Sequence, residues 1–359
     1  MALSKVNPNL ITNGGSRKNI IINGAMQVAQ RGTATANLGA ADGFFTIDRY
    51  KIDFGSSGGR LTMSQSSDVP NGFSKSLKVE CTTADTSIGA AEKLRIMYQF
   101  EGQEVRSIAK GTPDAKPITV SFYVKGNAAA TYACEIFDTD NSRQCTKLFN
   151  VTTGWQRIEL NFPTDTTGSF TDDNNTSIQL NFHLHGGSNF TSGTLNTNSF
   201  EASVNANRLV GIDSFYDSTS RTLNITGLQL ELGSVATDFE HRSYGEELAL
   251  CQRYFNTVYE GLLGVSIGTT QGMMSWPFPV TMRVAPTVSA TTDSVRFGDQ
   301  IVTGNTLTSM TVAATSFNSK EVAAWTMSGT ANVNLVNWRP ILLEPNTAAH
   351  ATFTFDAEL

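Results

Sequence analysis

The chain has 359 residues, a formal charge of −6 and a pI near 5.3; 40% of its residues are hydrophobic and only 16% are charged. This length exceeds one ordinary core, so we expect two domains. The acidic balance, without a basic stripe, argues against nucleic acid, because phosphate binding needs clustered Lys and Arg. No stretch approaches the ~20 apolar residues of a membrane helix, and the first residues lack the apolar core of a secretory signal. We therefore expect that the chain does not insert into a membrane and that it is assembled in a cytoplasm.

The N-terminal half is predicted to be built from strands. Residues 1–18 are polar and lack periodicity, which indicates an extended arm, and Asn19–Gly24 is predicted to begin the first strand. Up to about residue 240, apolar and polar residues alternate in one segment after another, as in half-buried strands. The clearest segments are Leu77–Cys81, Ile118–Val124, Tyr132–Phe137, Gln144–Val151, Ile158–Phe162 and Ile178–Leu184. Antiparallel strands with one wet face and turn-rich loops predict a β-sandwich over residues 19–240.

The last strand of this sandwich changes its phase. Leu223 and Ile225 are inward at odd positions, whereas Leu228, Leu230 and Leu232 are inward at even positions. One residue has to be absorbed between them. Gly227 is the natural site of a β-bulge, because glycine adopts unusual dihedral angles at little cost.

A short helix is predicted to link the two domains, within residues 241–257. Ser243 and Glu246 have the spacing of a capping box, and the helix should run to about Tyr254. One apolar stripe occupies four helical positions, namely Tyr244, Leu248, Cys251 and Phe255. This stripe packs either on the chain's own sandwich or against copies of itself on a symmetry axis.

Residues 258–359 return to strand patterns. These segments are Met273–Phe278, Thr281–Val284, Val288–Val295, Leu307–Ala313, Glu321–Met327, Val333–Trp338 and His350–Phe355. Prolines interrupt several of them and belong at edges or turns. The predicted fold class is therefore all-β: an N-terminal jelly-roll β-sandwich, a short linking helix and a smaller C-terminal β-sandwich.

The four cysteines, Cys81, Cys134, Cys145 and Cys251, show no metal-binding spacing. Cys134 and Cys145 flank a predicted turn symmetrically, so a disulfide across the hairpin is conceivable. In a reducing cytosol, two buried thiols are the preferred interpretation.

Several motifs together resemble a family of bacteriophage tail-fibre and virion appendage proteins. The resemblance covers most of residues 19–255, through Asn19–Gly32, Thr46–Tyr50, Gly72–Val79 and, most specifically, Gly227–Phe255; the ending Phe355–Leu359 is similar more weakly. It implies a homotrimeric appendage whose first domain is like a carbohydrate-binding module. Residues 1–18 would then attach to other virion proteins, and residues 258–359 would present the tip to a host-surface polysaccharide. The expected localisation is the virion. The alternative is a purely structural capsid decoration or head-fibre protein.

Metal and cofactor sites are not predicted. The resemblance implies a structural calcium at Asn23, Gln27, Gln229 and Glu231, but one carboxylate is a thin supply for an ion that takes 6–8 oxygen ligands. His183 and His185 lie two apart on one strand; with His241 or His350 they would suit a transition metal, yet solvent-face residues are the preferred interpretation.

No enzyme is predicted either. The carboxylate pairs Asp138/Asp140 and Asp172/Asp173 lie in Asn- and Thr-rich runs that are typical of turns, and no nucleophile elbow or phosphate-binding loop is present. Binding remains. Trp276, Trp325 and Trp338 all fall in the distal domain and are the candidate sugar platforms, although each one alone suits core packing better. Trp155 is similarly ambiguous.

Overall fold

A computed structural model describes residues 17–259, 261–290, 295–298, 305–307, 310–329, 335–345 and 352–359. By its contacts the chain divides into two compact units: unit 1 is Met1–Tyr244 with Leu359, and unit 2 is Gly245–Glu358. The predicted N-terminal arm lies outside the described residues, apart from residues 17 and 18. The finer division into arm, jelly roll, linker and tip stays a prediction.

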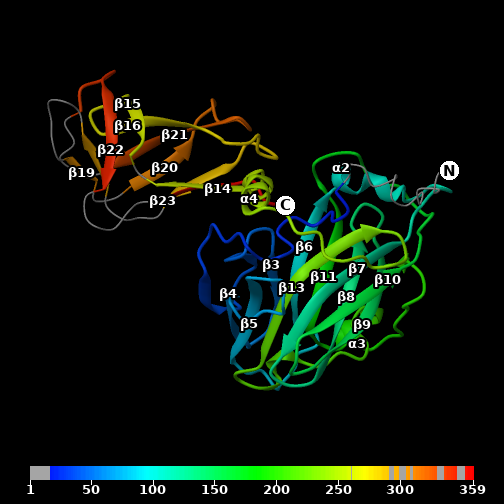
Figure 1. Cartoon of the computed structure of the whole chain (residues 1–359). Helices are drawn as coiled ribbons and strands as arrows, with labels where there is room; N and C mark the ends of the chain where they lie inside the picture. The colour runs from blue at the N-terminus through cyan, green and yellow to red at the C-terminus, as the bar shows by residue number, and fades with distance from the viewer. Residues whose placement is uncertain are drawn as a thin grey trace, which may run out of the picture. The chain divides into compact units, whose positions relative to one another are not determined.

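The described residues of unit 1 form two antiparallel sheets (Figure 1). The six-stranded sheet has the order β1 (Ala34–Leu38), β4 (Arg60–Ser66), β5 (Ser76–Thr83), β13 (Thr222–Leu232), β7 (Ile118–Gly126) and β10 (Gln156–Phe162). The seven-stranded sheet has the order β12 (Glu201–Ala202), β9 (Arg143–Val151), β8 (Ala130–Asp138), β11 (Thr176–Gly186), β6 (Lys93–Glu101), β3 (Lys51–Gly55) and β2 (Gly43–Phe44). Several neighbouring strands, such as β13 beside β5 and β11 beside β6, are distant in the sequence, as in a sandwich.

Alternating side chains from both sheets meet in one core. Phe122 of β7 in the six-stranded sheet packs edge-to-face on Phe149 of β9 and Phe182 of β11 in the other sheet, with ring centroids 5.1 and 4.9 Å apart. All three rings are at least 97% buried. Such contacts add to the burial of apolar area, which is the main favourable contribution to folding. The predicted all-β fold class is confirmed.

Asn19–Gly24 is not a strand, which corrects the prediction from its three isoleucines. The segment is instead held beside β13 by bonds from the Asn19 side chain and from single backbone groups. Asn19 donates from Nδ2 to the Leu228 carbonyl over 3.1 Å and accepts from the Leu230 amide over 3.1 Å, and Gly24 accepts from the Leu228 amide over 2.9 Å. Asn23 has a φ of 60°, a conformation outside the extended region. These irregular bonds to a strand more than 200 residues away take the place of a regular ladder.

The predicted bulge in the last strand is confirmed. Pairing of β13 with β7 shifts register between Thr226 and Gln229, and Gly227 has a φ of 62°. Core-facing Leu223 and Ile225 on one side, and Leu228 and Leu230 on the other, are all at least 98% buried. A single glycine thus keeps both halves of the strand facing the core.

Unit 2 is also built from antiparallel sheets. Its described strands form a three-stranded sheet, β14 (Phe255–Tyr259), β23 (Thr352–Asp356) and β17 (Thr287–Ala290), and a seven-stranded sheet, β19 (Asn305–Leu307), β18 (Val295–Gly298), β22 (Pro340–Pro345), β15 (Leu263–Ser266), β16 (Gln271–Pro277), β21 (Val322–Gly329) and β20 (Met310–Ala314). Trp325 of β21 packs on Phe353 and Phe355 of β23, each with ring centroids 5.4 Å away. Both sheets therefore contribute to one core.

The linking helix is shorter than predicted. Helix α4 spans Tyr244–Gln252 and begins directly after Ser243. Phe255, the fourth member of the predicted stripe, belongs to β14, where it is paired with Asp356. The chain enters strand β14 soon after the helix ends, so Phe255 is not on the helix and the predicted apolar stripe is not continuous. Along the rest of it, Tyr244 is 56% exposed, Leu248 is half-buried and Cys251 is fully buried. Among the described residues, no helix has the length and apolar character needed to cross a bilayer.

The remaining described helices of unit 1 are single turns. They are α2 (Gly102–Val105), η1 (Arg106–Ile108), α3 (Ser188–Thr191), η2 (Asn205–Asn207) and η3 (Phe215–Asp217). The hairpin β8–β9 places Cys134 opposite Lys147 and Cys145 opposite Ile136, so the two thiols are not cross-strand partners. Both thiols are buried and free, as preferred from the sequence.

Replacement of Gly227 by alanine should destabilise unit 1. An added Cβ would lie 2.6 Å from Cζ of Phe73 and 2.9 Å from Cδ2 of Tyr123, in a left-handed conformation. We expect the free energy of unfolding to fall by about 1–3 kcal/mol in urea titrations. Gly154→Ala is the matched control, because its Cβ would meet nothing within 4 Å. Equal effects of the two substitutions would contradict this account of the bulge.

Candidate functional site

The outer side of the seven-stranded sheet of unit 1 carries polar residues in register. Its strands send alternate side chains inward, and the remaining positions line up across β9, β8, β11, β6 and β3. Strand pairing gives three rows: Gln144–Phe137–Gln179–Gln99, Thr146–Glu135–Asn181–Met97–Lys51 and Leu148–Ala133–His183–Arg95–Asp53. We call these residues the polar face. They are the natural candidates for a binding surface.

A loop segment lies over β8 and β9 on this side. Within residues 203–213, Ser203 donates its amide to the Ser142 carbonyl, Arg208 binds Glu135, and Asp213 donates its amide to the Thr131 carbonyl. These contacts follow β8 from its far end to its beginning. The segment explains why Glu135 and Ala133, which alternate with core residues, are fully buried.

Glu135 is the centre of a charged network. Its carboxylate accepts two bonds from Arg208, over 2.7 and 2.6 Å, one from Asn181 Nδ2 over 3.0 Å and one from His183 Nε2 over 2.9 Å. Burial acts to raise the pKa of Glu135, but the charge of Arg208 outweighs it and holds this pKa well below its usual range. Glu135 is therefore a buried carboxylate anion with complete pairing.

A second ion pair lies on the neighbouring strands. Asp53 of β3 binds Lys93 of β6 over 3.0 Å and is paired with Arg95, whose guanidinium also approaches Gln179 Oε1 at 3.5 Å. Burial acts to raise the pKa of Asp53, and the charges of Arg95 and Lys93 outweigh it and keep this pKa below normal. The half-buried Arg95 and Gln179 are the accessible part of this area.

The polar face holds acceptor atoms that no described residue satisfies. Asn181 and Gln99 use their amide groups on Glu135 and on Thr176 Oγ1, which leaves both carbonyl oxygens without a donor. Burial lowers the pKa of His183 to about 4, so its ring is neutral at pH 7. Because Nε2 donates to Glu135, Nδ1 is an acceptor, and it too has no partner. Buried acceptors of this kind are uncommon and call for a donor.

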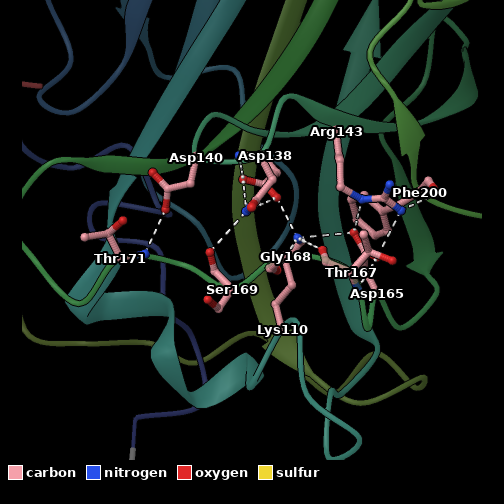
Figure 2. Close-up of polar contacts among 11 residues, drawn as sticks. Lys110, Asp138, Asp140, Arg143, Asp165, Thr167, Gly168, Ser169, Thr171 and Phe200 are labelled. Atoms are coloured by element: carbon pink, nitrogen blue, oxygen red, sulfur yellow. Dashed lines mark hydrogen bonds and ion pairs between the residues drawn. The ribbon is translucent and has the colours of Figure 1, made fainter.

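Unit 1 contains another polar cluster, which is shown in Figure 2. Lys110 Nζ contacts Asp138 Oδ2 at 2.6 Å, Asp165 Oδ2 at 3.3 Å, and the carbonyl oxygens of Thr167 and Gly168 at 2.6 and 2.8 Å. Arg143 makes two further bonds to Asp165, over 2.7 and 3.0 Å. These four side chains, Lys110, Asp138, Arg143 and Asp165, are the Lys110 cluster. The lysine ammonium binds oxygen atoms of several separate segments and holds these segments together, as a metal cation would.

The Lys110 cluster leaves little room for a ligand. The cavity beside it, lined by Ile108, Ile136 and Phe170 among others, has a volume of about 20 Å³, which is space for about one water molecule. Asp138 also accepts from the Asn141 amide over 3.0 Å, so the predicted turn is present. We regard the cluster as structural.

The other predicted carboxylates are also paired, Asp173 within its own turn and Asp140 and Asp172 with residues distant in the sequence. Asp140 accepts from the Thr171 amide over 2.9 Å (Figure 2), Asp172 lies 3.7 Å from Arg106, and Asp173 accepts from Asn175. These contacts fit the interpretation of both Asp pairs as turns.

The two strand histidines are buried, which corrects their predicted exposure. His183 and His185 are 3% and 0% exposed, and His185 contacts Glu92 at 3.0 Å and Ser214 Oγ at 2.8 Å. Segments that follow β11 in the chain supply the cover, which the strand pattern does not reveal. His241 packs on Phe73 and Phe239, while His350 lies outside the described residues.

The positions that the resemblance assigned to calcium do not fit the ion. Glu231 accepts from the Thr237 amide over 2.8 Å and from Gln229 over 3.0 Å, and Asn23 contacts both the amide and the carbonyl group of Val28. Protein donors therefore occupy the oxygens that a metal would need. Among the described residues, no group of three or more His, Cys, Asp or Glu side chains is arranged to hold a metal ion.

The three distal tryptophans differ in exposure. Trp325 is fully buried in the core of unit 2, so its ring does not reach the surface, and we remove it from the predicted sugar platform. Trp276 is half-buried against the same core. Trp338 is 74% exposed, with a φ of 64° in a turn anchored by its amide on the Ser266 carbonyl over 2.7 Å. Exposure and a left-handed backbone keep Trp338 as a candidate.

Comparison with known proteins gives structural similarity alone. No family model matches the chain, and no curated protein matches its sequence. Solved structures that it resembles include the enzymatically active domain of tailspike protein 4 of bacteriophage CBA120 (13% identity, TM-score 0.32) and a family 11 carbohydrate-binding module of Clostridium thermocellum in complex with a mixed-linked tetrasaccharide (11%, 0.29). Another is TmCBM61 in complex with β-1,4-galactotriose (10%, 0.32).

These similarities involve 58–60% of this chain. They span 21% of the tailspike chain and 99% of each of the two modules. With TM-scores of 0.32 or less, they carry no argument about a ligand. The argument for function therefore depends on the site itself.

Removal of the Lys110 ammonium should destabilise unit 1 strongly. Lys110→Met leaves Asp138 and Asp165 buried without their shared cation, so we expect a loss of about 3–5 kcal/mol in the free energy of unfolding. Arg106→Met is the control, because Arg106 and Asp172 are 72% and 63% exposed and their pairing should contribute less than about 1 kcal/mol. A similar small loss in both variants would show that the cluster is not a structural cation site.

Stability should fall as the pH is lowered from 7 to 5. The pKa of His183 is about 4 in the folded chain against 6.5 ordinarily, so in this window the unfolded state binds more protons. The contribution lost by pH 5 is about 2 kcal/mol, which urea titrations at both pH values will measure. His183→Gln should reduce this pH dependence, whereas replacement of the exposed His241 by glutamine should not. An unchanged pH dependence in His183→Gln would refute the assignment.

Proposed function

We propose that this chain is a non-catalytic, glycan-binding component of a bacteriophage appendage, and that the polar face is a sugar-binding surface. The observation that carries the proposal is the set of three acceptors without donors, on Gln99, Asn181 and His183 of the neighbouring strands β6 and β11. Cationic donors lie among them, on Arg95 and Arg208. Binding surfaces commonly combine a few convergent polar groups in this way.

A polyhydroxylated ligand matches this pattern chemically. Each sugar hydroxyl group can donate to an acceptor and accept from a guanidinium at the same time. The acceptors themselves are buried, and Arg95 and Gln179 are the half-buried side chains of this area, so a bridging water molecule would connect a ligand hydroxyl group to the acceptors. The planar amide groups would then fix the orientation of the sugar.

The state of the buried carboxylates supports a binding rather than a catalytic role. Glycoside hydrolysis needs one carboxylic acid that still carries its proton, which requires a raised pKa. The pKa values of Glu135, Asp53 and Asp165 are all lowered: burial acts to raise them, and their cationic partners outweigh it. These groups stay ionised near neutral pH and are unsuited to act as general acids.

The assignment to a phage particle is supported by the sequence motifs, above all Gly227–Phe255. In this proposal residues 1–18 attach to other virion proteins, and the chain forms a homotrimer. Weak sugar contacts would then combine, because linked sites raise the effective concentration of the ligand. Light scattering on the purified chain measures the oligomeric state.

Binding of glycans by the full chain should depend on the polar face. On an array of host-type polysaccharides we expect specific signals that Gln179→Ala and Gln99→Leu each reduce by about two- to tenfold, since one hydrogen bond to a bound ligand contributes about 0.5–1.5 kcal/mol. Gln103→Ala, on an exposed helix turn, should leave the signals unchanged. Thermal unfolding of each variant checks that the fold is kept.

Two other outcomes have a defined meaning. A loss of signal in Trp338→Ala alone would move the site to unit 2. Absence of any glycan signal would overturn the proposal and favour the alternative of a purely structural head-fibre or capsid decoration protein.

A further inference from the structure

The other sheet of unit 1 has a hollow on its outer side. Its volume is about 310 Å³, within the range of small-ligand sites. Strand residues, among them Lys78, Lys125 and Asn224, form its floor, and Asp68, Asn127 and Thr153 from three loops form its edges. Every lining residue that carries a side chain is polar or charged. The hollow lies on the opposite sheet from the polar face and shares none of its residues.

The floor of the hollow is one row of the six-stranded sheet. Asn224 of β13 is paired with Lys78 of β5 on one side and with Lys125 of β7 on the other. Asn224 is 96% buried, and its Nδ2 donates to Ser76 Oγ over 3.2 Å. The fixed amide group of Asn224 is therefore flanked by the side chains of two lysines, Lys78 and Lys125, on the neighbouring strands.

Asp68 organises one edge of the hollow. Its carboxylate accepts from Lys125 Nζ over 3.0 and 2.7 Å and from the indole nitrogen of Trp155 over 3.0 Å. Hydrogen bonding by Lys125 holds the pKa of Asp68 below its usual range. The half-buried Trp155 is the only tryptophan among residues 1–244, and Asp68 keeps its indole next to the hollow.

We propose that this hollow is a second saccharide-binding site, which takes one unit of a neutral sugar. Charges in and around it are balanced, because Lys125 is paired with Asp68 and Lys78 with Glu80 at 2.5 Å. An anionic ligand would therefore gain little, whereas hydroxyl groups can accept from the ammonium groups and donate to the carboxylate. The neighbouring indole offers an apolar surface for the C–H side of the ring.

This site goes beyond the function proposed above, since it stands on a different sheet and on different residues. Two sites on opposite sheets would let one subunit contact two glycan chains at once. The contacts would add through effective concentration even if each were weak.

Fluorine NMR of the full chain labelled with 5-fluorotryptophan tests the proposal directly. Maltotriose, cellotriose, mannotriose and galactotriose are titrated to about 10 mM, a range suited to millimolar Kd values. Trp155→Phe identifies the resonance of Trp155 among the four tryptophans. We expect at least one trisaccharide to shift this resonance saturably, while the three tryptophans of unit 2 stay unchanged.

Two variants connect the shift to the hollow. Asp68→Asn and Lys125→Gln, whose side chains are 47% and 30% exposed, should each weaken the binding about tenfold while the chain stays folded. Gln103→Ala, on an exposed helix turn outside both surfaces, should leave the curve unchanged. The inference is overturned if no trisaccharide moves the Trp155 resonance, or if both variants bind as the wild type does. Either result leaves the array test of the polar face intact, so the two proposals can fail separately.

Discussion

Mutual burial of one face of each sheet is the interaction on which the rest of unit 1 depends. Phe122, Phe149 and Phe182 meet across the two sheets, and the same alternation continues along neighbouring strands. Because successive side chains of a strand point to opposite sides, a shared core leaves the two outer faces free to differ. One outer face has become a network of buried charges, and the other a shallow polar hollow. Both arise from residues that the core does not use.

Buried charges constrain the polar face more than its hydrogen bonds do. Glu135 is fully buried, and a carboxylate in that position is tolerated only with complete pairing. Arg208 supplies the countercharge from a loop rather than from the sheet. Burial of the Glu135 anion therefore depends on the loop of residues 203–213, because this loop has to keep the conformation that places Arg208 beside the carboxylate. Sheet and loop form one functional element.

Alternation of residue types along the chain was enough to predict β5, β7, β8, β9, β10, β11 and β13, the hairpin and the bulge at Gly227, because these follow from local periodicity and from the dihedral freedom of glycine. The other strands of unit 1, including β1, β3, β4 and β6, were not predicted. The polar face was missed, since Gln179, Asn181 and His183 match any solvent-exposed side of a strand. The sequence contained one indication of a buried charge, namely Glu135, an acid within the otherwise apolar run Tyr132–Phe137. Its partner Arg208 lies 73 residues away, a pairing that only tertiary structure creates. The strand prediction for Asn19–Gly24 failed for a similar reason, since bonds from the Asn19 side chain and from single backbone groups to β13 replaced a regular ladder.

The thiols of unit 1 have a consequence for durability. Burial raises the pKa of Cys81 and of Cys145 to about 11 and that of Cys134 well above its ordinary value. Oxidants and other thiols react with the thiolate, which is scarce at such pKa values and shielded by the core. In unit 1 the formation of cross-links and sulfenic acids is suppressed in this way. The covalent structure of this unit is therefore insensitive to whether its surroundings are reducing or oxidising.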